Sequence, residues 1–168
     1  MSKTIIIIGA GLAGLSAALQ AAENGCNVKL VSSLPSERAQ SVMAEGGINA
    51  ALNTKDENDS PEEHFTDTIK AACGLADPNA VWGMIDAVRR KEASGMVERF
   101  SHHSFLTLRL CGNICCGCVI RDEYSQETVE LPGDAVIVAT GGMHGLFGNT
   151  TGSLSNTGEV TAELFRLG

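Results

Sequence analysis

The most regular hydrophobic pattern of the chain is an unbroken run of four isoleucines, from Ile5 to Ile8. An apolar β-branched run of this kind predicts a parallel strand that is buried on both faces. The alanine-rich segment at residues 15–25 predicts a helix that ends at Gly25. Residues 27–31 then predict a second strand, which completes a β-α-β unit.

Helix and strand signals continue along the chain. Ser60 is expected to cap a helix that begins at Pro61, because proline suits the first helical position. Asp77 and Pro78 repeat this signal before a second helix, which is expected to end at Gly95. A glycine-bearing loop is expected at residues 43–51. Strands are predicted at residues 97–101, 105–110, 114–121, 128–131 and 135–138, with turns at 112–113 and 123–126.

This order of elements predicts a single α/β domain over residues 1–168. Its fold class is Rossmann-like, with a parallel sheet, helices, and a small β-meander inserted within about residues 104–132. The chain has 168 residues, of which 43% are hydrophobic and 19% are charged, so it suffices for one core.

The charge balance limits the partners that we expect. The formal net charge is -8 and the sequence pI is about 4.9, which argues against nucleic acid or an anionic membrane as a partner. A single lysine precedes the short isoleucine run, so neither a secretory signal nor a direct membrane span is expected. The expected location is therefore cytoplasmic.

A G-x-G-x-x-G motif at Gly9, Gly11 and Gly14 joins the first strand to the first helix. The first glycine allows a tight turn, the second lets the backbone approach a pyrophosphate, and the third lets the helix pack closely on its strand. The first-turn N–H groups would then face the phosphates. The alternative is a glycine cluster that only packs the helix. The second strand ends in Ser32 and Ser33, where NAD-binding proteins carry an acid, which argues against plain NAD.

Four of the six cysteines form a C-x3-C-C-x-C cluster at Cys111, Cys115, Cys116 and Cys118. This spacing differs from the ligand spacings of structural zinc and iron–sulfur sites, so no metal is expected. We interpret the cysteines as small buried residues of a β-hairpin. No disulfide is expected in a reducing cytoplasm.

The histidines offer no clear catalytic group. His102 and His103 are adjacent in an extended segment and are expected to point to opposite faces, while His64 and His144 lie in or near loops. All four are expected to be solvated, because none has an orienting partner in the sequence. The catalytic residues therefore stay unassigned, and no Ser-His-Asp motif is present.

Two longer segments, VSSLPSERAQSVMAEGGINAAL at residues 31–52 and DAVIVATGGMHGLFGNTTGSLSNTGEVTAELFRLG at residues 134–168, carry a family resemblance. Together with the glycine motif, they resemble the FAD-binding domain of the fumarate reductase and succinate dehydrogenase flavoprotein subunits, with L-aspartate oxidase as a close relative. The resemblance implies FAD as cofactor and two-electron transfer between the flavin and a C4 dicarboxylate. It also implies an iron–sulfur electron-transfer subunit as partner.

The resemblance further implies a set of cofactor-binding positions, from the pyrophosphate and ribose to the isoalloxazine and adenine. They are Gly9, Ala10, Gly11, Leu12, Ala13 and Gly14 at the pyrophosphate, Ser32 and Ser33 at the adenosine ribose, and Ser41, Ala44, Glu45, Gly46 and Gly47 around the flavin ring. Ser104 and Phe105 would edge the adenine. Ala139, Thr140 and Gly141 would approach the adenosine and phosphates, and Glu159 would lie close to the flavin.

The chain departs from the family pattern in three respects. Gln40 stands where the membrane-bound relatives carry the histidine that bonds covalently to the flavin, so we expect non-covalent FAD. Glu45 stands where the family usually has glutamine, and an ionised carboxylate near the ring would lower the flavin potential. The capping and C-terminal helical domains, which bind the dicarboxylate in the family, have no counterpart in this sequence.

Other functions stay open. The main alternative is a non-catalytic domain that binds FAD, or only its ADP portion. Such a domain would need a missing segment or a partner to complete the active site. L-aspartate oxidase-like activity is a further alternative. An interaction domain without nucleotide would keep the same fold, but the intact glycine turn argues against it.

Overall fold

The computed structural model describes residues 2–35, 38–39, 60–79 and 97–168. The chain divides into two compact units, one formed by Met1–Ala44 with Ala93–Gly168 and the other by Glu45–Glu92. The first unit contains both β-sheets, and the second contains helix α3, which is Pro61–Ala71.

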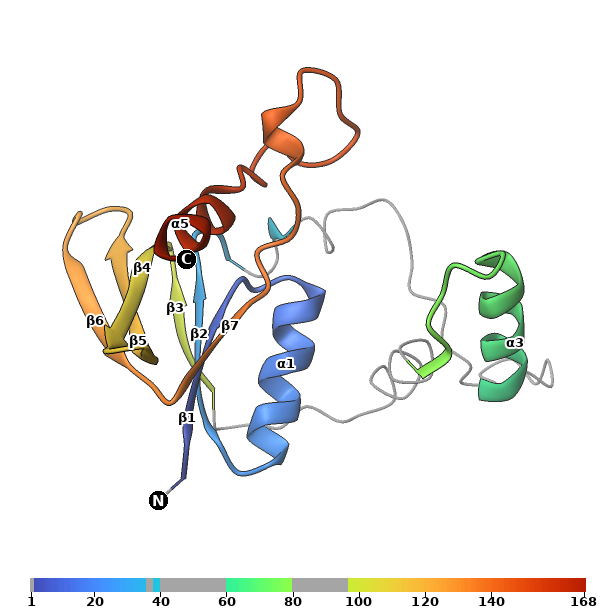
Figure 1. Ribbon diagram of the computed structural model, residues 1–168, viewed down its shortest axis with the longest axis horizontal. Helices are drawn as coiled ribbons and strands as arrows, with labels where there is room; N and C mark the ends of the chain where they lie inside the picture. The colour runs from blue at the N-terminus through green and yellow to red at the C-terminus, as the bar shows by residue number, and fades with distance from the viewer. Residues whose placement is uncertain (1, 36–37, 40–59, 80–96) are drawn as a thin grey trace. The chain divides into compact units, whose positions relative to one another are not determined.

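The larger sheet of the first unit has four parallel strands in the order β3-β2-β1-β7. These are β1 (Thr4–Ile8), β2 (Asn27–Ser32), β3 (Val97–Ser101) and β7 (Ala135–Val138). The chain first builds outward from β1 to β3 and later returns to the other side of β1 as β7 (Figure 1). This arrangement confirms the predicted Rossmann-like parallel sheet.

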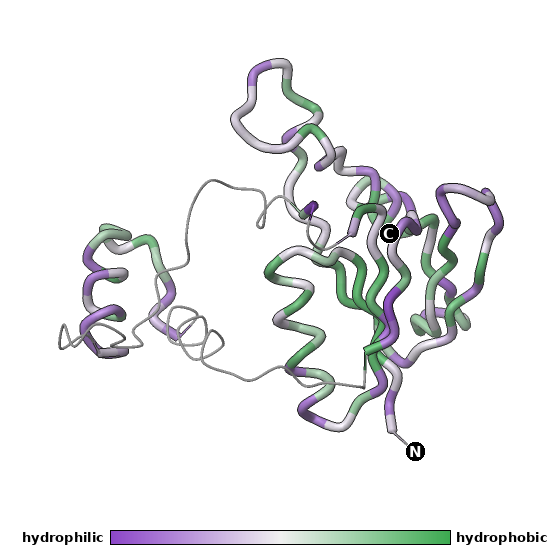
Figure 2. The backbone as a smooth tube through the Cα atoms, turned by 180° about the vertical axis from the view of Figure 1, so that it is seen from behind, coloured by the Kyte–Doolittle hydropathy of each residue, from purple (hydrophilic) through white to green (hydrophobic). Residues whose placement is uncertain are grey.

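Different elements cover the two faces of this sheet, and successive side chains of β1 point to opposite faces. Ile7 packs in one core cluster with the alanines of α1 (Leu12–Glu23). Ile6 and Ile8 pack in a second cluster with residues of the meander, among them Ile120. All three isoleucines are buried, and each contributes about 1.5–3 kcal/mol by the usual burial scale. Figure 2 shows the hydrophobic segments gathered in α1 and the strands beside it.

The smaller sheet is the predicted meander, between β3 and β7 in the sequence. Its antiparallel strands are β4 (His103–Cys111), β5 (Ile114–Asp122) and β6 (Thr128–Pro132), in that order. Gly112 and Asn113 form the two-residue turn between β4 and β5, with Gly112 at φ +65°. The predicted hairpin turn is therefore confirmed.

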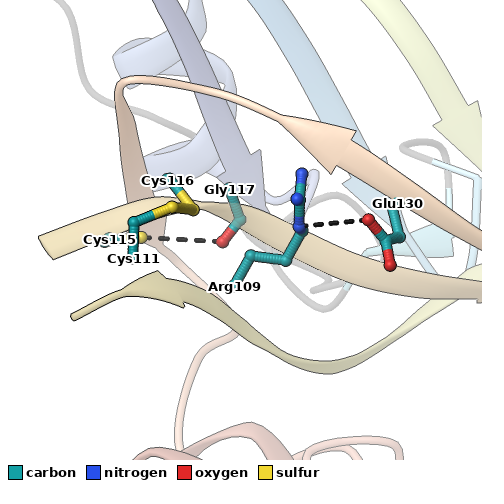
Figure 3. Close-up of a disulfide and its surroundings, with 6 residues drawn as sticks. All are labelled: Arg109, Cys111, Cys115, Cys116, Gly117 and Glu130. Carbon is teal, nitrogen blue, oxygen red and sulfur yellow. Dashed lines mark hydrogen bonds and ion pairs between the residues drawn. A yellow bond between two sulfur atoms is a disulfide. The ribbon is translucent and has the colours of Figure 1, made fainter. Parts of the chain in front are cut away.

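A disulfide joins Cys111 and Cys116 near the tip of this hairpin (Figure 3). A register shift between Arg109 and Leu110 leaves Cys116 as an extra residue on β5. Ile114 pairs with Cys111, and Cys116 lies two residues further along β5, so the two cysteines lie on the same side of the hairpin. Their Cα atoms are 6.1 Å apart, a separation that a disulfide spans. The prediction of no disulfide was wrong, because it considered the compartment and not the strand register.

The helical signals also agree with the structure where it describes them. The Ser60 hydroxyl accepts a hydrogen bond of 3.1 Å from the backbone N–H of Glu63, so Ser60 caps α3 as predicted. Residues 78–79 are helical and follow Asp77 as predicted, but the remainder of that helix and the loop at residues 43–51 lie outside the described residues. In the described part of the chain, every helix is too short or too polar to cross a membrane.

Candidate functional site

The first unit contains a cavity of about 610 Å³ beyond the carboxyl ends of β1, β2 and β7. The strand order reverses at β1, which has β2 on one side and β7 on the other. Ligands of open α/β sheets bind outside the carboxyl ends of the strands at such a reversal. Of the predicted site residues, those that line the cavity are 9–13, 32–33, 104–105, 139–141 and 159.

The glycine turn forms the floor of the cavity between β1 and α1. Gly9 has φ +111°, and a Cβ added there would overlap the carbonyl oxygen of Ala139. The N–H of Gly9 donates a hydrogen bond of 2.8 Å to the Val31 carbonyl, which fixes the turn to β2. Gly9 is therefore required by the close approach of two strands as well as by the turn.

Gly14 plays a packing role. It is buried in α1, and a Cβ at this position would overlap the carbonyl oxygen of Gly9. Helix α1 therefore lies directly against the turn, as the third glycine of the motif predicts. Among the described residues, Gly14 is not part of the cavity lining.

The N-termini of two helices meet at the cavity. Gly11 is the N-cap of α1, in extended backbone at φ -77° and ψ -174°, and as a glycine it contributes no side-chain cap. Gly158 and Glu159 at the start of α5 (Glu159–Leu167) also line the cavity. The first N–H groups of a helix lack intrahelical partners and carry partial positive charge, so both termini favour an anionic ligand.

The charged groups of the lining are few. Among the described lining residues, Arg38 is the one guanidinium and Glu159 the one carboxylate. Arg38 was not predicted as a site residue, because no sequence motif marks it. Its backbone N–H donates a hydrogen bond to the Pro35 carbonyl, and this loop brings it to the cavity. Its cationic side chain adds to the preference for an anion.

The segment after β7 contributes backbone to the opposite side of the cavity. The N–H of Ala139 donates a hydrogen bond of 2.7 Å to the Ile8 carbonyl, and Gly141 has φ +78°. The sequence interpretation missed three parts of this wall, namely Gly142, His144 and residues 155–158. His144 lies in a short 3-10 helix, η2 (His144–Leu146), and nothing in its sequence neighbourhood indicates a cavity residue.

The adjacent histidines differ from expectation. His102 has φ +61° and therefore interrupts the extended segment, with its ring centroid 5.1 Å from that of Tyr124. His103 lines the cavity with a side chain that is only 17% exposed, and its ring contacts Phe100 edge-on at 5.7 Å. The prediction of extended backbone is confirmed for His103, the first residue of β4 (His103–Cys111), and is wrong for His102. The prediction that His103 is solvated was wrong, because its ring packs against Phe100.

Several predicted positions lie outside the described residues. They are Gln40, Ser41, Ala44, Glu45, Gly46 and Gly47, which the resemblance assigns to the surroundings of the flavin ring. Their role stays a prediction.

The cysteine cluster is divided between a disulfide and separate thiols. Cys118 is buried in the core, and burial, followed by the nearby Cys115, raises its pKa to about 11. The Cys115 thiol lies 3.6 Å from the Gly117 carbonyl (Figure 3). Within the described ranges, no group of three or more His, Cys, Asp or Glu residues is arranged to hold a metal ion.

Comparisons with known proteins agree with this geometry. A family model described as "FAD binding domain" matches residues 4–93, which is more than half of the chain. The succinate dehydrogenase flavoprotein subunit of Bacillus subtilis is 33% identical over 221 residues, covering 99% of this chain and 38% of that subunit. The L-aspartate oxidase of Streptomyces coelicolor is 38% identical over 99 residues, covering 56% of this chain and 17% of that enzyme.

Solved structures show the same fold. A quinol fumarate reductase of E. coli superposes with a TM-score of 0.74 at 23% identity, over 99% of this chain and 37% of that chain. The Sdh1 complex of Mycobacterium smegmatis gives a TM-score of 0.73 at 23% identity, over 99% and 39% of the two chains. The chain thus spans less than two fifths of the length of these relatives.

Proposed function

We propose, from the premise that this chain belongs to the FAD binding domain family, that its cavity holds FAD non-covalently. We further propose that the chain is the nucleotide-binding part of an oxidoreductase of the succinate dehydrogenase and fumarate reductase type. One observation carries this proposal: the glycine turn and the N-terminus of α1 line the same cavity at the reversal of strand order.

The described residues fit a dinucleotide. The N-terminus of α1 carries the partial positive charge that favours a pyrophosphate, and Gly11 at the N-cap adds no side chain between helix and ligand. Arg38 and the second helix terminus at α5 add positive potential. The volume of about 610 Å³ lies within the range of cofactor cavities.

The chemistry that we propose follows from this cofactor. Bound FAD supplies a carrier that exchanges two electrons with a substrate by hydride transfer. The residues of this chain would hold and orient the nucleotide, with backbone at residues 9–13 and 139–141 approaching it closely. The substrate would be a C4 dicarboxylate such as succinate or fumarate, and an iron–sulfur subunit would exchange electrons with the flavin.

A second candidate is a binding domain without turnover, which holds FAD or only its ADP portion. The described lining favours this candidate, because it presents mainly backbone and small side chains that would hold a nucleotide, and this chain aligns with 38% of the Bacillus subtilis subunit. L-aspartate oxidase-like chemistry is the remaining alternative, supported by the similarity to the Streptomyces coelicolor enzyme.

Purified protein loaded with FAD separates these functions. After desalting, a flavin spectrum with close to one FAD per chain is expected, and colourless protein that rejects added FAD would refute the binding. Bleaching by succinate, or reoxidation of the reduced flavin by fumarate, would support turnover. Bleaching by aspartate would favour the oxidase, and stable FAD with none of these reactions would leave the binding domain.

The same sample tests the mode of attachment. Acid precipitation is expected to release the yellow colour into the supernatant, because Gln40 offers no histidine for a covalent bond. Flavin that stays in the pellet would contradict non-covalent binding.

A further inference from the structure

Two consecutive side chains at the start of β4, His103 and Ser104, form part of the cavity wall. Both are attached to the turn that follows β5, which spans residues 122–126 and is named here the 122–126 turn. The Glu123 N–H donates a hydrogen bond of 2.8 Å to the His102 carbonyl and thereby ties this turn to the start of β4.

Both nitrogens of the His103 ring lie close to protein oxygen atoms. Nδ1 lies 2.9 Å from the Ser101 carbonyl oxygen, and since a carbonyl only accepts, this bond requires a hydrogen on Nδ1. Nε2 lies 3.6 Å from Oδ2 of Asp122. Because both nitrogens face protein atoms, the ring offers the cavity only its face or its carbon edge.

The partner carboxylates are themselves held in place. The backbone N–H groups of Ser125 and Tyr124 each donate to Oδ1 of Asp122 at 2.8 Å, and these bonds hold the pKa of Asp122 below its ordinary value. Asp122 is therefore ionised, with Oδ2 toward His103. The Ser104 hydroxyl donates to Oε1 of Glu123. The wall is thus built before any ligand arrives.

The strand register locates this wall within the cavity. Ser101 at the end of β3 pairs directly with Ser32 at the end of β2, so His103 begins β4 just beyond the carboxyl edge of β2. In dinucleotide-binding folds the end of the second strand receives the adenosine ribose, while the pyrophosphate lies at the first helix. The flat group of a bound dinucleotide that would lie nearest to His103 is therefore the purine.

We infer that the His103 ring is a stacking surface for the purine of the bound adenine nucleotide. This inference rests on the proposed function and adds a recognition residue to it. An imidazole face suits a neutral aromatic base, because stacking needs no polar atom from the ring.

The test compares ring-retaining and ring-removing variants of the full chain. ADP contains the purine and pyrophosphate but no flavin, so its affinity, measured by calorimetry, reports on this wall and the pyrophosphate site without any contribution from the flavin ring. His103→Leu is expected to weaken ADP and FAD binding by the same factor, roughly fivefold to a hundredfold, as for other base–aromatic stacks. His103→Phe is expected to stay within about threefold of the wild type, because it keeps an aromatic face.

The adjacent histidine supplies a matched control. His102 contacts Tyr124 and is not part of the cavity lining among the described residues, and asparagine tolerates its positive φ. His102→Asn is expected to bind ADP as the wild type does, with thermal melting confirming that all three variants fold.

The outcomes separate this inference from the function on which it rests. Unchanged ADP affinity in His103→Leu overturns the inference while FAD binding by the wild type still supports the function. Equal losses in His103→Leu and His103→Phe also overturn it, because the ring would then not be what binds. A wild type that binds neither FAD nor ADP overturns both.

Discussion

A charge placed at the N-cap of α1 gives a sharp test of the cofactor site. Gly11 lines the cavity and has extended backbone at φ -77° and ψ -174°, which any residue adopts. Aspartate and asparagine are both favourable N-cap residues, so Gly11→Asp and Gly11→Asn should each change folding stability by only a few tenths of a kcal/mol. The two side chains have nearly the same shape, and they differ in charge.

The expected difference in FAD affinity follows from that charge. Two unit charges about 4 Å apart repel by about 1 kcal/mol in bulk water and by about 4 kcal/mol near a protein surface. The site is a cavity open to solvent, so we take a middle value of about 2 kcal/mol for the carboxylate against the pyrophosphate, which is roughly a 30-fold weaker Kd. Gly11→Asp should therefore bind FAD about 30-fold more weakly than Gly11→Asn.

Flavin fluorescence titration of both variants measures this ratio directly. The ratio should shrink when the salt concentration rises from about 50 mM to about 500 mM, because salt screens exposed charges. Thermal melting without FAD should give similar Tm values for the two variants. Equal Kd values for FAD in the two variants at low salt would refute the placement of the pyrophosphate at this helix.

Three further predictions concern stability. Gly9→Ala should lower the free energy of unfolding, measured by urea titration, by about 1–3 kcal/mol more than Gly25→Ala does. Both glycines have positive φ, but of these two only Gly9 has backbone where a Cβ would lie. Equal losses in the two variants would contradict the proposed clash. Reduction of Cys111–Cys116 should cost about 2 kcal/mol for so short a loop, and a Cys111→Ser variant should not respond to reductant. Burial raises the pKa of the Cys118 thiol from 9.0 to about 11, so the unfolded chain loses this proton at lower pH than the folded chain. The free energy of unfolding should therefore fall as the pH rises through this window, and it should fall less in Cys118→Ala. Identical pH profiles of the two proteins would contradict this.

The elements that depend on local pattern could be predicted from the residues alone. The isoleucine run fixed β1, the glycines around it predicted the turn, and Ser60 with Pro61 predicted the start of α3. These signals need only neighbouring residues, because burial on both faces, positive φ and helix capping leave their mark within a few positions of the chain.

Only the tertiary structure decided what lies between distant segments. The disulfide links the two strands of the β4–β5 hairpin, and His103 lines the cavity with its ring against Phe100 and close to Asp122 of the 122–126 turn. Position 9 has no room for a side chain, because the carbonyl oxygen of Ala139, directly after β7, lies where a Cβ would be. Such contacts depend on which strands become neighbours and in what register, and the sequence pattern around each residue carries no record of either.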